Sequence, residues 1–207
     1  MGRLVVVSHP LLQVALTRIR DRETGIEGFR RAITTAARIL AVEATRDLPV
    51  KRVSVRTPIR RTSGSALKHG VVLVPVLRAG VSMLEAFLEA LPDAAVGFVG
   101  QKRDERTLEP RNYLFNVPQP LGRRRVVVLD PMLATGGSSS ATVAGLKERG
   151  AKDLVCVHLL AAPEGVERFV RDHPDVPLFV GALDSKLNGS GFIVPGLGDA
   201  GDRCFGT

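Results

Sequence analysis

The chain has 207 residues, 44% of them apolar and 24% charged, which excludes a disordered or fibrous protein and fits one α/β domain over residues 1–207. Its net charge of +8 favours an anionic partner, either a nucleic acid, an acidic surface or a polyphosphate substrate. With one Tyr, no Trp and 4% aromatic residues, the chain lacks material for the stacking platforms of single-strand binders, so a small polyphosphate is favoured over a nucleic acid.

The first apolar segment, Leu4 to Val7, is too short for a signal peptide and is soon followed by Pro10. No other apolar run approaches the ~20 residues that a membrane span requires. We therefore expect a cytoplasmic protein without membrane contact.

The N-terminal quarter predicts elements that cover one side of a core. Apolar residues at helical spacing predict helices over Leu11–Ile19 and Phe29–Ala44, and Val53 and Val55 alternate with polar residues like an exposed strand. The segment Thr57–His69 is rich in Arg, Ser and Gly without an apolar period, so we expect a loop there.

The remaining chain alternates short apolar runs with helix-patterned segments, which predicts an α/β fold with a doubly wound, mostly parallel sheet and flanking helices. Most runs are continuously apolar, as expected for strands covered on both faces. The predicted strands are Val71–Leu77, Ala95–Val99, Val126–Leu129, Leu154–Leu160 and Leu178–Ala182. The predicted helices between them are Val81–Leu91, Ala141–Glu148 and Gly165–Arg171.

Two segments do not fit this alternation. Residues 101–120 carry many charges of both signs between two core strands, which predicts a protruding arm. The tail, residues 188–207, contains six glycines. That density argues against regular structure but suits a backbone wrapped closely around a ligand.

The most informative segment follows the third predicted strand. That strand delivers Asp130 to its carboxyl end, where open α/β sheets bind ligands, and a loop of small residues then opens a helix. Gly136 and Gly137 allow the backbone to form a nest of N–H donors, while Thr135 and Ser138 add hydroxyl groups. This arrangement suits a phosphate monoester.

The loop Thr135–Ser138 could also only turn the chain and cap a helix. Its place behind Asp130 favours phosphate binding, because a carboxylate there can accept hydrogen bonds from ribose hydroxyls. A Walker A loop is disfavoured because no Lys stands beside Ser138, and a GxGxxG motif is lacking. We therefore expect a site for ribose 5-phosphate.

Cysteine and histidine form no catalytic or metal-binding pattern. Cys156 and Cys204 lack metal spacing, and we expect free thiols without a role in the reaction. The histidines lie far apart in the sequence, so we expect no protein metal site. They are His9, His69, His158 and His173.

The chain resembles the type I phosphoribosyltransferases, and more narrowly the uracil phosphoribosyltransferases, over nearly its whole length. The most specific motifs are Asp130-Pro131-Met132-Leu133-Ala134-Thr135-Gly136-Gly137-Ser138 and Ile193-Val194-Pro195-Gly196-Leu197-Gly198-Asp199-Ala200-Gly201-Asp202-Arg203. Shorter matches include Leu77-Arg78-Ala79-Gly80 and Ala161-Ala162-Pro163-Glu164-Gly165. The chain departs from the family at Lys102, where a tyrosine is usual before the arginine, and this puts a stacking role in doubt.

The resemblance implies transfer of phosphoribosyl from phosphoribosyl pyrophosphate (PRPP) to uracil, giving UMP and pyrophosphate. It assigns catalysis to Asp130, Arg78 and Arg103, and planar guanidinium groups do bind phosphate oxygens bidentately. These three residues are also implied to bind PRPP together with Pro131, Met132, Leu133, Ala134, Thr135, Gly136, Gly137, Ser138 and Asp199. Within a base-binding hood formed by residues 188–207, the implied uracil ligands are Ile193, Gly198, Asp199 and Ala200.

The resemblance also implies Mg²⁺ as a cofactor, held by the diphosphate and ribose hydroxyls of the donor, and a homodimer or larger even homo-oligomer. An RNA-binding regulator on the same fold is the alternative function. A transferase for a purine or another pyrimidine is a second alternative, which the tail argues against. Allosteric activation by GTP and the role of Asp199, orienting the donor or stabilising positive charge near the ribose, stay open.

Overall fold

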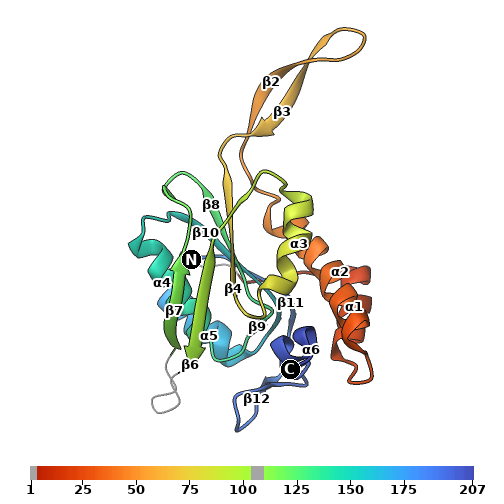
Figure 1. The fold of residues 1–207 in the computed structure, drawn as a ribbon, viewed down its shortest axis with the longest axis vertical. Coiled ribbons are helices and arrows are strands. Elements are labelled where there is room, and N and C mark those ends of the chain that lie inside the picture. The colour runs from red at the N-terminus through yellow and green to blue at the C-terminus, as the bar shows by residue number, and fades with distance from the viewer. Residues whose placement is uncertain (1–3, 104–109) are drawn as a thin grey trace.

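The computed structural model describes residues 4–103 and 110–207, without the side chains of residues 102, 103 and 110–112 (Figure 1). Its main sheet has the strand order β1-β11-β10-β8-β4-β6-β7, and all neighbours on this path are parallel except β6 and β7. These strands are β1 Leu4–Val6, β4 Val71–Leu77, β6 Phe98–Arg103, β7 Pro110–Asn116, β8 Arg125–Leu129, β10 Asp153–Ala161 and β11 Leu178–Leu183. Two short strands, β5 Ala95–Val96 and β9 Met132–Leu133, pair with β4 and β10.

The five predicted core strands are therefore confirmed, with one break. The run Ala95–Val99 divides at Gly97, where an added Cβ would lie 2.8 Å from the Cα of Val117. The close approach of that backbone separates β5 from β6.

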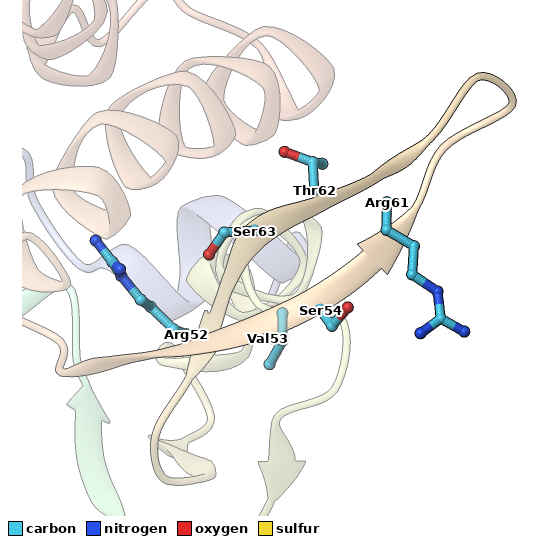
Figure 2. A pocket seen from close by; sticks show the side chains of 6 residues that line it. All are labelled: Arg52, Val53, Ser54, Arg61, Thr62 and Ser63. Carbon is cyan, nitrogen blue, oxygen red and sulfur yellow. The ribbon is translucent and has the colours of Figure 1, made fainter.

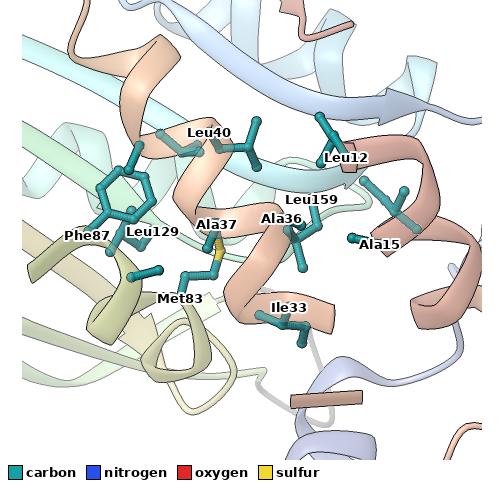
Figure 3. Close-up of a cluster of buried hydrophobic side chains, with 14 of the residues drawn as sticks. Leu12, Ala15, Ile33, Ala36, Ala37, Leu40, Met83, Phe87, Leu129 and Leu159 are labelled. Carbon is teal, nitrogen blue, oxygen red and sulfur yellow. The ribbon is translucent and has the colours of Figure 1, made fainter. Parts of the chain in front are cut away.

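Helices cover both faces of the sheet, which confirms the doubly wound α/β fold. On one face α1, α2 and α3 enclose a core with β8 and β10, in which Leu12, Ile33, Leu40, Phe87 and Leu129 are fully buried (Figure 3). On the other face α4 and α5 bury a second cluster around Val128, Cys156 and Phe169. The helices are α1 Pro10–Arg20, α2 Ile26–Ala44, α3 Val81–Ala90, α4 Gly137–Glu148 and α5 Pro163–Asp172. In the described part of the chain, no helix combines the length and apolarity needed to cross a membrane.

The prediction of a loop over Thr57–His69 is wrong. Arg61–Leu67 forms strand β3, which pairs antiparallel with β2, Val50–Arg56, and the two project from the body as a hairpin (Figure 1). Main-chain bonds between two solvent-exposed strands need no apolar period, so the pattern gave no signal. Only β2 was anticipated, and it projects into solvent instead of covering the core.

The segment 101–120, predicted as an arm, is in part the edge of the main sheet. β6 and β7 pair antiparallel, so residues 110–116 return along the strand that leads into the segment. Residues 104–109 lie outside the described part of the chain.

The tail contains more regular structure than its glycines led us to expect. Strand β13, Ile193–Val194, pairs with β12, Lys186–Leu187, and helix α6 spans Ala200–Phe205. Buried Ile193 and Leu197 anchor the tail in the first core cluster. These apolar contacts offset the backbone entropy that glycines lose on ordering.

Candidate active site

The predicted catalytic residues lie where the sheet reverses its strand order. From β4 the chain continues to β6 on one side, whereas from β8 it continues to β10 on the other, and β4 and β8 are parallel neighbours. Arg78 follows β4 and Asp130 follows β8. Ligands bind in open α/β sheets at such switch points, outside the carboxyl ends of the strands.

The main chain after Asp130 is fixed against β10. The carbonyl of Pro131 accepts hydrogen bonds from the N–H groups of Leu159 at 2.9 Å and Leu160 at 3.1 Å. The carbonyl of Leu133 accepts one from Ala162 at 3.0 Å. The start of the loop is therefore held in place by main-chain hydrogen bonds to β10.

Gly136 makes the turn from this support into helix α4. Its φ is +76°, and an added Cβ would lie 2.7 Å from the carbonyl oxygen of Gly165, so no other residue fits without movement. In the described chain, no hydrogen bond engages the N–H groups of Gly137 and Ser138. These donors sit at a helix N-terminus, which favours a bound anion.

A hollow of about 80 Å³ lies over this loop and is lined by Asp130 and residues 132–139. Asp130 as a whole residue is half-buried beside the hollow, and its Oδ1 accepts a weak hydrogen bond from the N–H of Met132 at 3.4 Å. Removal of the carboxyl group from water raises the pKa of Asp130 to about 7. A ligand that donates hydrogen bonds to the ionised carboxylate would reverse this shift, and ribose hydroxyls are such donors.

Arg78 connects this edge of the sheet to the tail. Its side chain is 60% exposed, and Nη2 lies 3.5 Å from Oδ1 of Asp202 on α6. Figure 1 shows α6 at the end of the molecule where β4 and β6 finish. Arg103 ends β6 at the same edge, but its side chain is outside the described part of the structure.

The predicted uracil residues lie together in the tail. Asp199 caps α6 by accepting a hydrogen bond at Oδ1 from the N–H of Asp202 at 2.9 Å. Gly198 has a φ of +82°. Within the described chain, no hydrogen bond engages the N–H or C=O of Gly198 or the N–H of Ala200. These groups are available to a ligand.

Two side chains near the loop were not anticipated as neighbours of the site. His158 is buried in β10 one residue beyond the Val157–Leu129 pair, and burial lowers its pKa to about 4, so the ring is neutral. Its ring nitrogens have no hydrogen-bond partner among the described residues. On α5, the Nη1 atom of Arg168 lies 3.3 Å from the position a Cβ would take on Gly137. A single His in an apolar run and one of two Arg residues on a helix carry no motif, so sequence patterns could not single them out.

A separate open hollow of about 400 Å³ lies on the β2–β3 hairpin (Figure 2). It is lined by Arg52, Val53, Ser54, Arg61, Thr62 and Ser63. The hairpin projects from the end of the molecule opposite α6, so this hollow is remote from Asp130 (Figure 1). We assign it no part in the chemistry.

Among the described residues, no group of three His, Cys, Asp or Glu side chains could hold a metal ion. Mg²⁺ commonly binds through substrate phosphates and one or two carboxylates.

Comparisons with known proteins cover the whole site. A family model described as uracil phosphoribosyltransferase matches residues 6–207. Curated proteins named uracil phosphoribosyltransferase from Bacillus cereus and Bacillus anthracis are 47% identical over 208 residues, covering 100% of both chains. A solved structure from Aquifex aeolicus matches with a TM-score of 0.94 and 39% identity over 98% of each chain. A hypoxanthine-guanine phosphoribosyltransferase from Bacillus anthracis matches in fold, with a TM-score of 0.53 and 15% identity over 77% of this chain and 80% of that one.

Proposed function

The chain belongs to the uracil phosphoribosyltransferase family, and we propose that it transfers the phosphoribosyl group of PRPP to uracil, giving UMP and pyrophosphate. One observation carries the proposal beyond the family. Three features lie at one edge of the sheet, at its switch point. They are a carboxylate that follows a buried strand, a loop whose N–H donors have no partner among the described residues, and a tail whose main-chain groups likewise have none. Each matches a different part of the two substrates.

We assign the donor to the loop and the two arginines. The 5-phosphate would accept hydrogen bonds from the N–H groups of the loop, and Asp130 would accept hydrogen bonds from the ribose hydroxyls. Arg78 and Arg103 would bind the pyrophosphate through their guanidinium groups. The other proposed PRPP ligands are Pro131, Met132, Leu133, Ala134, Thr135, Gly136, Gly137, Ser138 and Asp199.

We assign uracil to the tail. Uracil presents two carbonyl acceptors on either side of one ring N–H, which matches a loop that offers N–H, C=O and N–H in turn. Among the described residues, the N–H and C=O of Gly198 and the N–H of Ala200 have no partner and match this order of donors and acceptors. Ile193 and Asp199 are the other proposed uracil ligands. Cytosine replaces one carbonyl by a donor and lacks the ring N–H. We expect ~10³-fold or greater discrimination, because bound cytosine would cover main-chain groups of the hood and leave them without a partner.

The reaction we propose is displacement of pyrophosphate from the anomeric carbon by a ring nitrogen of uracil. The bond from that carbon to the pyrophosphate oxygen breaks, the bond to the ring nitrogen forms, and the proton of the nitrogen passes to the departing pyrophosphate or to water. The transition state has oxocarbenium character, so the protein contributes positioning and electrostatic stabilisation instead of covalent chemistry. Arg78 and Arg103 would stabilise the departing pyrophosphate, and Asp130 would fix the ribose. Mg²⁺ bound through the donor's diphosphate and ribose hydroxyls would supply further charge neutralisation.

Other properties stay predictions from the family resemblance. They are a homodimer or larger even homo-oligomer, a cytoplasmic location, and a GTP effector. The arm around residues 101–120 and the hood over residues 188–207 are likewise proposed as functional parts of one domain.

The decisive experiment measures pyrophosphate release from PRPP with Mg²⁺ and each of five nucleobases in turn. We expect release with uracil alone. Release with a purine would indicate a transferase of different specificity. No base-dependent release, together with RNA binding whose log affinity falls linearly with log salt concentration, would favour the RNA-binding regulator.

Replacing Arg103 by Ala should raise the KM for PRPP roughly tenfold with little change in thermal stability, because one phosphate-binding guanidinium is lost from a strand end. Steady-state kinetics with varied PRPP and a thermal melt measure the two effects. An unchanged KM for PRPP would return Arg103 to the role of a solvated surface charge.

A further inference from the structure

A buried ion pair links the first helix to the hood. Asp184 directly follows β11, and its side chain is 4% exposed. Its Oδ2 accepts a hydrogen bond from Nη1 of Arg20, the last residue of α1, at 2.8 Å. The second carboxylate oxygen accepts from Nη2 of the same guanidinium, so the pair is bidentate. Such a pair fixes the relative orientation of its two side chains.

The same pair binds both main-chain polar groups of Gly196. Oδ2 of Asp184 accepts a hydrogen bond from the N–H of Gly196 at 2.8 Å. Nη1 of Arg20 donates to the C=O of Gly196 at 3.0 Å. Gly196 has a φ of +61°, and an added Cβ would lie 2.2 Å from the carbonyl oxygen of Ile193. The residue therefore forms a corner in the tail that only glycine fits and that the ion pair fixes on both sides.

This corner stands two residues before Gly198 and four before Ala200. No hydrogen bond among the described residues engages the N–H and C=O of Gly198 or the N–H of Ala200. Glycines at 196 and 198 give the backbone wide conformational freedom, so the angles that aim those groups must be imposed from outside. We propose that Arg20 and Asp184 are positioning residues that fix the hood in its uracil-reading conformation, an inference that rests on the proposed function.

The fixation of the donor loop is independent of this pair. Hydrogen bonds from β10 fix Pro131 and Leu133, and neither Arg20 nor Asp184 contributes to them. Loss of the pair should therefore affect uracil far more than PRPP, because Asp199 is the only one of the proposed PRPP ligands that lies in the hood. Because a misplacement of about 1 Å can cost roughly 10²-fold in rate, a modest displacement of the hood is enough to be measured.

The test compares Asp184→Asn and Arg20→Lys with the parent protein. Asparagine can still accept the bond from Gly196 but turns a donor toward Arg20, and a lysine ammonium lacks the planar fork that reaches Asp184 and Gly196 together. We expect the KM for uracil to rise about tenfold or more in Asp184→Asn and less in Arg20→Lys. The KM for PRPP should stay within about twofold of the parent value, and the preference for uracil over cytosine should fall.

The matched control is Arg38→Gln, which breaks the bidentate but exposed pair that Arg38 forms with Glu89 at 2.6 and 2.8 Å, outside the hood. It should leave both KM values unchanged. Equal rises in the KM for uracil and for PRPP, or no change in either for the folded variants, would overturn the positioning role. Failure of the parent protein to use uracil would instead overturn the proposed function. If Asp184→Asn does not fold, Arg20→Lys decides the matter by the same ratio of KM values.

Discussion

Replacing Asp130 by Asn should lower kcat/KM for PRPP about 10²-fold, because the charge-assisted hydrogen bonds from the ribose hydroxyls lose roughly half their strength. The fold should persist. Asparagine has the same shape, and its Oδ1 can still accept the 3.4 Å bond from Met132. Steady-state kinetics with varied PRPP measure the loss, and circular dichroism checks the fold.

The same substitution should make the protein more stable at alkaline pH. Burial raises the pKa of Asp130 to about 7 in the folded chain, above the value of about 3.9 in an unfolded chain. The usual sign for a carboxylate is therefore reversed. As pH rises from about 4 to about 7 the unfolded state releases its proton first, and the parent protein loses stability over that window.

The amide introduced by Asp130→Asn has no proton to release in this range, so the variant avoids this loss. We expect a Tm gain of roughly 3 to 8 °C at pH 8 and almost none at pH 4, from melts of both proteins without ligand. Asp93→Asn, which changes an exposed carboxylate after α3, is the control and should show neither effect. Unchanged kinetics in folded Asp130→Asn would rule out the ribose role of Asp130. If the variant and the parent protein had the same Tm at pH 8 as well as at pH 4, an ionised, desolvated carboxylate at this position would be ruled out.

The core could be predicted from sequence because burial on both faces leaves an unbroken apolar run. Val71–Leu77 was predicted with both of its ends correct, since every residue from Val71 to Val76 is buried. Where strands pair without burial, as in β3, the composition of Arg, Ser and Gly resembles that of a loop. β1 contains three described residues, Leu4–Val6, and its pairing with β11 depends on a segment far along the chain.

The residues of the site likewise divide into those that the sequence could single out and those that it could not. Asp130 and Arg78 could be singled out because each follows a buried strand at its carboxyl end, a position that topology makes functional. Arg20 and Asp184 could not, because 164 residues separate them and neither stands in a pattern of its own. Only the folded chain shows that they meet at one glycine.

Replacing Gly198 by Val should lower uracil turnover at least ~10²-fold, because the φ of +82° at this position is an outlier for any β-branched residue. Obstruction by the new side chain is not supported as the reason, since among the described residues an added Cβ would meet only Cδ of Arg203, at 3.8 Å. The backbone would instead leave the left-handed region and turn the free N–H and C=O away from uracil. Kinetics with varied uracil measure the effect.

Gly189→Val is the matched control, because Gly189 lies in the same tail with a φ outside the left-handed region. In the described part of the chain, no atom lies within 4 Å of a Cβ added there. This variant should retain uracil turnover. Ile193→Val should retain it as well, because it changes only a side chain, whereas Ile193 is proposed to contact uracil through its main chain. Substitution tests the hood more sharply than deletion of residues 193–207, because deletion would also remove buried Ile193 and Leu197 from the core. Uracil turnover within about threefold of the parent in folded Gly198→Val would show that the base is read elsewhere.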